Sequence, residues 1–281
     1  MAARTSALWR LRGRDHDLSA RGMVMGVLNV TPDSFSDGGK FRDVNTAVEH
    51  GLRMIADGAD ILDVGGESTR PGAAPVILQD EMERVIPVIK KLRAYSDVLI
   101  SVDTMKAEVA RCAVDAGADI INDITGFRDE AMIQVAAQSE AALIIMHMQG
   151  TPQTMQARPS YHDVVSEVST FFTQRSSVLQ ERGVARERLA FDPGFGFGKT
   201  LEHNLALLRS LSVLHENHGP LVIGVSRKSM IAHLLNDNRI ENRDWPTVAL
   251  TAWMRESGAQ VVRVHDVKPN VEAMRMIEAI L

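Results

Sequence analysis

The sequence predicts a single-domain (β/α)8 barrel, the TIM-barrel architecture, and three observations indicate it. Short apolar runs alternate with amphipathic helical patterns, which is typical of a parallel sheet covered by helices. Eight such units can be traced, and the 281 residues of the chain suffice for the roughly 250 that this barrel needs. No proline-rich or serine-rich linker divides the chain. We therefore expect the barrel domain over residues 21–281, preceded by an N-terminal cap segment over residues 1–20.

The first unit sets the pattern for the others. Its strand is the apolar run Met23–Leu28, which has the length of a strand buried on both faces and stops at the amide of Asn29. A hydrophilic loop with Asp33 and Gly38–Gly39 follows, and it is too long for a simple connection. It is more typical of a functional lid, although a solvated surface loop is the alternative for this stretch taken alone. The helix after it has apolar side chains at helical spacing, with Asn45 as its candidate N-cap.

The second unit repeats this arrangement. A strand at 61–64 leads into the glycine-rich polar loop 65–72. A helix with one apolar face is expected from about Gln79 to Arg93. Pro87 lies inside that pattern, so we expect it to kink the helix or to mark its true start.

The remaining strands also end in polar side chains. They are the apolar runs 99–102, 120–121, 143–146, 189–191, 221–225 and 261–262. The helices expected after them are one capped by Thr104, one over about 129–138, a long one ending near Arg182, one carrying Leu201 to Leu211, and a last one from Val271 to the C-terminus.

A weak internal repeat supports the equivalence of the units. Its copies read GADILD at 58–63, GADIIN at 117–122 and GAQVVR at 258–263. In each copy a glycine closes a helix and a polar residue follows the strand at the same offset. The repeat therefore places Asp63, Asn122 and Arg263 at matching depths.

In such a barrel the carboxyl ends of all strands surround one mouth, where this architecture carries out its chemistry. The polar groups expected there are, in chain order, Asn29, Asp63, Asp103, Asn122, His147, Asp192, Lys228 and Arg263 with His265. Any one of them could simply cap a strand or a helix. Burying so many polar groups together has a cost unless they find partners, so the set predicts a binding site.

Three of these groups suit a flat, nitrogen-rich ring. Asp103, Asn122 and Asp192 could bind a planar heterocycle that bears amino and ring N–H donors and a carbonyl. Carboxylates accept paired N–H donors, and an amide both donates and accepts. The Gly-Phe-Gly-Phe-Gly segment at 194–198 is not a nucleotide-binding fingerprint, and we expect it to line an aromatic slot.

Other polar residues of the mouth could bind an anion, through cationic side chains, or a hard metal ion, through an amide oxygen. Arg70, Lys228 and Arg263 could hold the anion, each arginine through its bidentate fork. No His and Cys cluster has the spacing of zinc ligands. A Mg²⁺ ion bound mostly through substrate phosphates and one amide oxygen, as from Asn29, is the alternative that stays open.

Bulk composition excludes several classes. A formal charge of −5 with only 5% aromatic residues argues against a nucleic-acid-binding surface. No apolar run reaches the roughly 18 residues of a membrane span, and residues 1–20 have no apolar core of a secretory signal. Asp15 and Asp17 disfavour a transit peptide there. A single cysteine allows no disulfide within the chain, which fits the cytoplasm.

With these residues in place, the sequence resembles the bacterial dihydropteroate synthases from about Met25 to Ile277. The resemblance rests on five segments in order, which are GVLNVTPDSFSDGG at 26–39, GGESTRPG at 65–72, FDPGFGFGK at 191–199, SRKS at 226–229 and RVHD at 263–266. It implies a homodimer of (β/α)8 barrels that joins 4-aminobenzoate to 6-hydroxymethyl-7,8-dihydropterin diphosphate. The products would be diphosphate and dihydropteroate for folate biosynthesis, and the enzyme would be a sulfonamide target.

The resemblance implies a role for each matching residue. It assigns pterin contacts to Asp103, Asn122, Asp192 and Lys228, and the Mg²⁺ ligand to Asn29. It assigns the surroundings of the diphosphate to Thr69, Arg70, Arg263 and His265, and the 4-aminobenzoate slot to Arg70, Pro71, Phe197 and Ser226. The loops of Asp33 and Arg70 close over the site in the family, and the catalytic set would be Asp33, Arg70, Asp103 and Lys228. The chain departs from the family where the family varies, at 125–127, which concerns local pocket shape.

The mechanism implied is a dissociative alkyl transfer, in which the electron-rich pterin stabilises a cation as diphosphate leaves. Two alternatives fit the sequence less well. A pterin-dependent methyltransferase on the same barrel would share the Asp, Asn, Asp set but has no use for the segments 69–71 and 263–265. A pterin-binding protein without turnover would be favoured if an anion-binding or metal-binding residue were missing, and none is.

Overall fold

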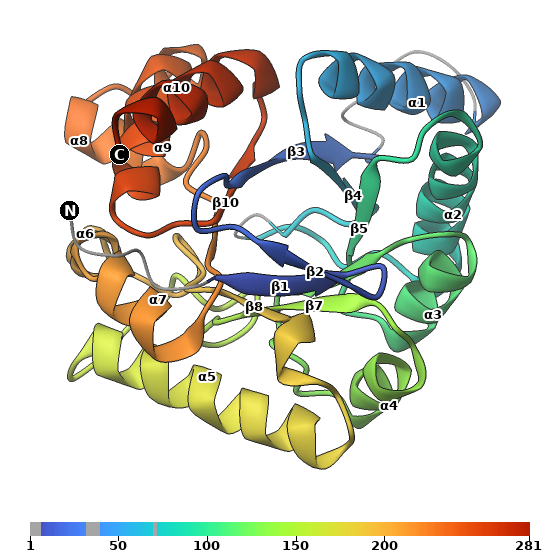
Figure 1. Cartoon of the computed structure of the whole chain (residues 1–281), viewed down its shortest axis with the longest axis horizontal. Coiled ribbons are helices and arrows are strands. Elements are labelled where there is room, and N and C mark those ends of the chain that lie inside the picture. Colours follow the sequence, from blue (N-terminus) through green and yellow to red (C-terminus); the bar gives the residue numbers. More distant parts are fainter. Residues whose placement is uncertain (1–6, 32–39, 70–71) are drawn as a thin grey trace.

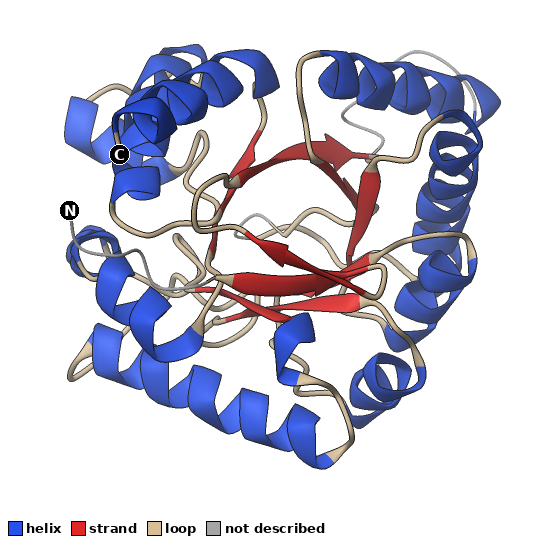
Figure 2. Cartoon of the chain, in the orientation of Figure 1, coloured by secondary structure: helices blue, strands red, loops and turns tan. Residues whose placement is uncertain are grey.

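The computed structural model describes residues 7–31, 40–69 and 72–281, without the side chains of 40–42. Eight parallel strands form a barrel, and helices surround it (Figures 1 and 2). The strand order is β8-β7-β6-β5-β4-β3-β10-β9, and a bridge between Phe191 and Leu221 joins the two ends of the sheet. The predicted single-domain (β/α)8 barrel is confirmed, while the boundary between residues 20 and 21 stays a prediction.

The barrel strands follow the predicted apolar runs closely. They are β3 Met23–Asn29, β4 Ile61–Gly65, β5 Leu99–Asp103, β6 Ile120–Asp123, β7 Ala142–Met146, β8 Leu189–Asp192, β9 Val222–Ile223 and β10 Val261–Val264. Only β9 is clearly shorter than expected. Side chains alternate between the two faces of a strand, so every second residue points into the barrel.

The predicted helices depart from the structure mainly at their ends, and the helices at 229–235 and 244–256 were not predicted. They are α1 Lys40–Ala56, α2 Leu78–Tyr95, α3 Ala107–Asp115, α4 Glu130–Gln138, α5 Val164–Glu181, α6 Leu201–Arg209, α7 Leu211–His218, α8 Ser229–Leu235, α9 Asp244–Glu256 and α10 Val267–Ile280. Short 3₁₀ turns occupy Arg186–Arg188 and Glu241–Arg243.

Two predicted N-caps were wrong, and both side chains make tertiary contacts. Asn45 lies inside α1, where its Oδ1 accepts a 2.7 Å hydrogen bond from Nζ of Lys91 on α2. Thr104 lies two residues before the true cap, Lys106. Its hydroxyl donates to Oε1 of the buried Glu81 at 2.6 Å and accepts from the backbone N–H of Lys106 at 3.1 Å.

Other helix boundaries also differ from the pattern. Pro87 lies inside α2 and does not mark its start. The helix predicted to carry Leu201 to Leu211 is interrupted at Ser210, which separates α6 from α7. The last helix begins at Val267, before the predicted Val271.

An N-terminal hairpin covers the amino end of the barrel, and sequence reasoning missed its strands. β1 (Leu8–Leu11) and β2 (Arg14–Asp17) pair in antiparallel fashion and cross the barrel in Figure 1. Trp9 is fully buried, and its Nε1 donates to the carbonyl of Arg188 at 3.1 Å. It belongs to an apolar cluster with the first inward residues of the strands, including Met25, Ile61, Ile120, Ala142, Ala190, Val222 and Val261. The amino end of the barrel is therefore apolar and closed.

The polar inward positions lie at the opposite end. β4 presents Ile61 and then Asp63, and β5 presents Leu99, Ser101 and Asp103 in the same direction. Outward side chains of the strands pack against the helices in the main hydrophobic cluster. The inward-facing side chains are therefore apolar at the amino end of the barrel and polar at its mouth.

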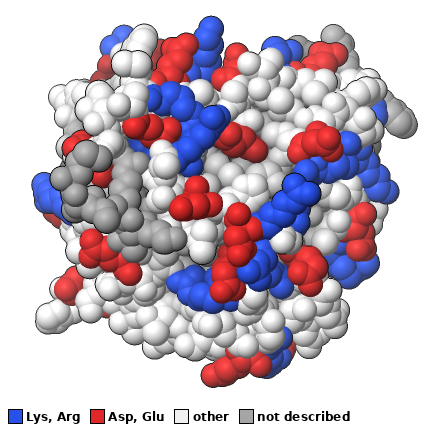
Figure 3. Space-filling model, viewed as in Figure 1, with Lys and Arg blue, Asp and Glu red and all other residues white. Residues whose placement is uncertain are grey.

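Two properties of the described residues concern membranes and surface charge. No helix in the described ranges combines the length and apolar character needed to cross a membrane. On the face shown in Figure 3, the basic and acidic side chains of the described residues are interspersed and form no basic stripe.

Candidate active site

The mouth of the barrel is organised around one arginine. Nε of Arg263 donates to Oδ2 of Asp63 at 2.6 Å, and its Nη2 donates to Oδ2 of Asp103 at 2.9 Å. Nδ2 of Asn122 donates to the same Asp63 oxygen at 3.2 Å. Asp63 is fully buried, and the guanidinium is held by carboxylates of the two adjacent strands β4 and β5. Strands β4, β5, β6 and β10 each contribute one member of this network.

The electrostatics of this network are set by burial and by unequal charge. Burial and the neighbouring Asp63 raise the pKa of Asp103 to about 7, although Arg263 lowers it. Burial disfavours the charged form of Arg263, but Asp63 and Asp103 outweigh it and raise the arginine pKa above its ordinary value. The arginine therefore stays charged, and Asp103 titrates near neutral pH.

Several buried oxygens in this part of the mouth have no hydrogen-bond donor among the described residues. They are Oδ1 of Asp63, Oδ1 of Asp103, Oδ1 of Asn122 and Oγ of Ser101. A buried acceptor without a partner costs about 1–3 kcal/mol. Their grouping on the inward face of three adjacent strands is what a ligand rich in N–H donors would satisfy.

A second cluster surrounds the loop after β8. Oδ1 of Asp192 accepts from the backbone N–H of Gly194 at 2.7 Å, and burial raises the Asp192 pKa while Lys228 lowers it. Nζ of Lys228 donates to the carbonyl of Phe195 and lies 4.6 Å from the ring centroid of Phe197. Burial lowers the pKa of Lys228 to about 8.

The last pair joins the ends of β9 and β10. Oγ of the buried Ser226 lies 3.0 Å from Nδ1 of His265 and accepts from the His265 backbone N–H at 3.2 Å. The serine thereby fixes the orientation of the imidazole beside the rim of the mouth.

Most of the predicted site residues lie at the carboxyl ends of the strands, as the barrel requires. Asp103, Asn122 and Arg263 meet around Asp63, Phe197 meets Lys228, and Ser226 meets His265. Thr69 is half-buried in the loop after β4, and Asn29 is half-buried at the end of β3. The predicted Asp33, Arg70 and Pro71 lie outside the described residues.

Asp63 is the central residue to which sequence reasoning assigned no role. The GADILD repeat places it in the ring, but its partners could not be deduced. His147 was also in the ring, and it is buried with Nδ1 3.0 Å from Nζ of Lys199.

The described part of the chain contains no group of three or more His, Cys, Asp or Glu side chains arranged to hold a metal ion. Asn29 stands opposite Gly65 in the sheet, so no side chain of β4 is present at that register position. A single amide oxygen fits a Mg²⁺ ion that takes most of its oxygens from substrate and water.

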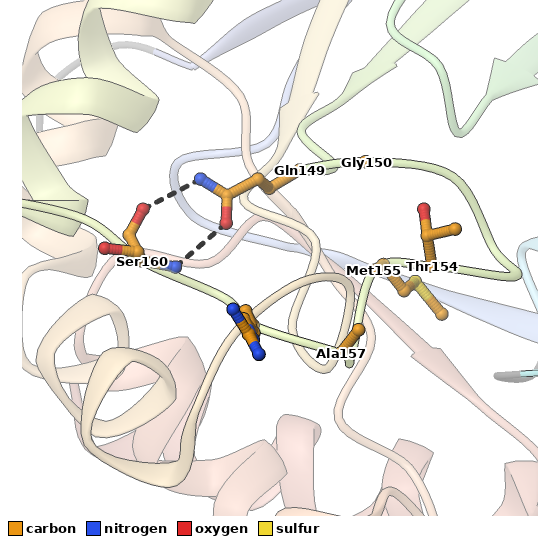
Figure 4. Close-up of a pocket in the computed structure, with 7 residues that line it drawn as sticks. Gln149, Gly150, Thr154, Met155, Ala157 and Ser160 are labelled. Atoms are coloured by element: carbon orange, nitrogen blue, oxygen red, sulfur yellow. Dashed lines mark hydrogen bonds between the residues drawn. The ribbon is translucent and has the colours of Figure 1, made fainter.

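A separate depression of about 380 Å³ lies in the β7–α5 loop, with none of the predicted site residues in its lining. Figure 4 shows that Gln149 and Ser160 close one side through paired hydrogen bonds of 2.8 and 3.0 Å. Met155, on another side, belongs to a methionine cluster that packs against Phe197.

Comparison with known proteins places this geometry in a family context. The sequence profile of the family described as "Pterin binding enzyme" matches residues 25–265. The dihydropteroate synthase of Escherichia coli K12 is 49% identical over 258 residues, which cover 92% of this chain and 91% of that protein.

Solved structures agree along nearly the whole chain. A Yersinia pestis dihydropteroate synthase in a sulfonamide drug complex is 46% identical with a TM-score of 0.91, covering 97% of this chain and 98% of that one. A Xanthomonas albilineans dihydropteroate synthase with 4-aminobenzoic acid is 43% identical with a TM-score of 0.91, covering 98% of both chains.

Proposed function

The chain belongs to the dihydropteroate synthase family of pterin binding enzymes, and from this premise we propose how its own side chains carry out the family reaction. It is a transferase of folate biosynthesis that joins 6-hydroxymethyl-7,8-dihydropterin diphosphate to 4-aminobenzoate. The products are 7,8-dihydropteroate and diphosphate. The observation that carries the detailed proposal is the Arg263 guanidinium held by Asp63 and Asp103 beside unpaired acceptor oxygens.

The pterin is recognised through those acceptors. Its amino and ring N–H groups donate to the free oxygens of Asp103 and Asn122, and Asp192 and Lys228 complete the contacts. These two buried acceptors gain donors, so the site rejects ring systems that lack the corresponding N–H groups. Arg263, whose fork is already held in place by two carboxylates, offers its flat face to the ring.

The transfer follows from where charge develops. The bond between the exocyclic carbon of the pterin and the diphosphate oxygen breaks, and its electron pair leaves with diphosphate. Ionised Asp103 favours the cationic pterin that results. The arylamine nitrogen then forms the new C–N bond with its lone pair and releases a proton to water. The arylamine is a sufficient nucleophile, so no serine or cysteine is needed.

The leaving group is stabilised at the rim. Arg263 and His265 accept its charge together with Thr69 and Arg70, the last of which lies outside the described residues. Asn29 would hold Mg²⁺, which supplies charge neutralisation at the diphosphate. Exclusion of water from the mouth would favour attack by the arylamine over attack by water. The predicted Asp33 lies outside the described residues.

The arylamine slot lies beside the pterin. Phe197 forms an aromatic wall with the Lys228 ammonium 4.6 Å from its ring centroid, and Ser226 is anchored nearby by His265. Arg70 and Pro71, which the family resemblance assigns to this slot, lie outside the described residues. Sulfonamides, for which this family is a target, compete as arylamines for the same slot.

The chain works as a homodimer in the cytoplasm under this proposal. Large exposed apolar side chains support the dimer. They are Trp245 and Trp253 on α9 and Met276 and Ile280 on α10, which packs against α9. Such large apolar side chains on adjacent helices are typical of an interface. The single cysteine suits a reducing compartment.

The decisive experiment mixes purified protein with Mg²⁺, the pterin diphosphate and 4-aminobenzoate and measures 7,8-dihydropteroate by chromatography. Formation of product that needs every component supports the proposal. Equilibrium binding of the pterin without release of diphosphate would instead identify a pterin-binding protein without turnover.

A further inference from the structure

The loop Gly194–Gly198 that carries Phe197 is flexible by composition yet densely bonded. Gly194, Gly196 and Gly198 have φ values of +69°, +78° and +64°, in the left-handed region that favours glycine. Glycine loses more conformational freedom on folding than any other residue, so this loop needs external contacts to hold one shape.

Each carbonyl from Gly194 to Gly198 accepts a hydrogen bond from a side chain. Lys199 donates to the carbonyls of Gly194 at 3.0 Å and Phe197 at 3.1 Å. The other donors are Lys228 to Phe195, Gln156 to Gly196 at 2.5 Å, and Tyr161 to Gly198 at 2.8 Å. Lys199 donates to the loop at two points, and one of them is the carbonyl of Phe197.

The environment of Lys199 is unusual for a lysine. The residue is only 3% exposed, and its remaining bonds run to Nδ1 of His147 at 3.0 Å and to the His147 carbonyl at 3.3 Å. Burial and the nearby Lys199 lower the pKa of His147 to about 3, so the imidazole is neutral and accepts at Nδ1. All hydrogen-bond partners of Lys199 in the described ranges are therefore neutral groups.

A buried ammonium without a bonded carboxylate is costly. Burial lowers the pKa of Lys199 to about 7 for this reason, although Asp192 opposes the shift. An apolar side chain of similar length would avoid that cost, but it would leave the carbonyl of Phe197 without a donor and the carbonyl of Gly194 with only the backbone N–H of Phe197. The arrangement thus gives up stability for a defined loop shape.

We propose that Lys199 is a positioning residue for the arylamine substrate, because its ammonium fixes the backbone of Phe197 against the end of β7 and so sets the aromatic wall of the 4-aminobenzoate slot. This inference rests on the proposed function. It concerns one substrate more than the other, since the pterin is bound mainly by Asp103, Asn122 and the Arg263 network.

The test compares wild-type enzyme with Lys199→Met and a matched control, Arg188→Met. Arg188 is also a buried cation (5% exposed) that donates to backbone carbonyls, those of Ala136 and Ala141, but it lies at the amino end of the barrel. Steady-state kinetics give separate KM values for 4-aminobenzoate and for the pterin diphosphate. Hydrogen exchange of the amides in 194–199 reports loop order independently of activity.

Lys199→Met should raise KM for 4-aminobenzoate about 10-fold or more, because a small displacement of the Phe197 ring would misplace the bound arylamine. KM for the pterin diphosphate should change less than about 2-fold, exchange in 194–199 should accelerate, and Arg188→Met should alter neither KM. If Lys199→Met does not fold, Lys199→Gln, which retains two N–H donors, should show the same split to a smaller degree.

Equal changes in both KM values, or an unchanged KM for 4-aminobenzoate in the folded variant, would overturn the positioning role. Failure of both Lys199 variants to fold would show that Lys199 acts only in stability and would overturn it too. Failure of the proposed function is seen separately, as absence of dihydropteroate from the wild-type enzyme.

Discussion

Replacing Asp63 with asparagine tests the charge arrangement at the centre of the mouth. Asp63 accepts from Nε of Arg263 at 2.6 Å and is one cause of the raised pKa of Asp103. The Asp63→Asn substitution would keep the shape of the side chain and remove its negative charge. Because a nearby negative charge raises the pKa of a carboxyl, its removal should lower the pKa of Asp103 below about 7.

The magnitude follows from Coulomb's law. Two carboxylates that share one guanidinium fork lie about 5 Å apart, where like charges repel by about 3 kcal/mol at an effective dielectric constant of about 20. That energy corresponds to about two pKa units, and rearrangement of Arg263 should reduce the shift to about one unit. Loss of the charged hydrogen bond should also lower the free energy of unfolding by about 1.5–3 kcal/mol.

The assay is the pH dependence of kcat/KM for the pterin diphosphate, which reports groups of the free enzyme. In wild-type enzyme the value should rise as Asp103 ionises near pH 7, and in Asp63→Asn this rise should move about one pH unit lower. Urea denaturation measures the accompanying loss of stability.

Asp119→Asn is the matched control. Asp119 also binds arginines, Arg12 at 2.6 Å and Arg93 at 2.6 Å, but it precedes β6 at the amino end of the barrel. It should lose comparable stability and leave the pH profile in place. The electrostatic reasoning would be refuted if the rise of kcat/KM in Asp63→Asn occurred at the same pH as in wild-type enzyme or at a higher pH. It would also be refuted if Asp119→Asn moved this rise by the same amount.

Three further predictions concern the remaining parts of the enzyme. Lys228→Ala should raise KM for the pterin diphosphate and lower kcat in steady-state assays, and wild-type kinetics in this variant would remove Lys228 from the site. In wild-type enzyme, kcat/KM should decline as pH rises through about 8, where Lys228 loses its proton. Asn29→Ala should raise the Mg²⁺ concentration for half-maximal rate about 10-fold, as expected for loss of the protein's own ligand, and an unchanged Mg²⁺ titration would contradict that assignment. Trp245→Arg should convert a dimer to a monomer in analytical ultracentrifugation, whereas Tyr95→Arg, on the exposed face of α2, should leave the dimer intact; a variant that still sediments as a dimer would place the interface elsewhere.

Helix ends show where local patterns stop being sufficient. Asn45 and Thr104 have the side chains of N-caps, yet each is used in a tertiary contact, to Lys91 and Glu81 respectively. Cap preference is worth about 1 kcal/mol, which a contact between neighbouring helices readily matches. The N-terminal hairpin was missed for a similar reason, since Trp9 belongs to a short segment whose burial depends on the barrel beneath it.

The sequence alone determined the barrel and the position of its polar mouth. Strand and helix periods are local properties, and the polar residue after each apolar run marks the carboxyl end of a strand without reference to its neighbours. Those regularities were enough to place Asp103, Asn122 and Arg263 at the mouth, and the motifs were enough to name the family that they resemble.

Only the tertiary structure decided which of these groups bind one another. Arg263 and Asp63 are 200 residues apart in the chain, and their 2.6 Å contact depends on closure of the barrel and on the stagger between strands. The same holds for Lys199, whose partner His147 comes from the end of the neighbouring strand β7 and whose bonds shape a loop that its glycines leave flexible. Side-chain pairing across a closed sheet is a long-range property, so no pattern along the chain records it.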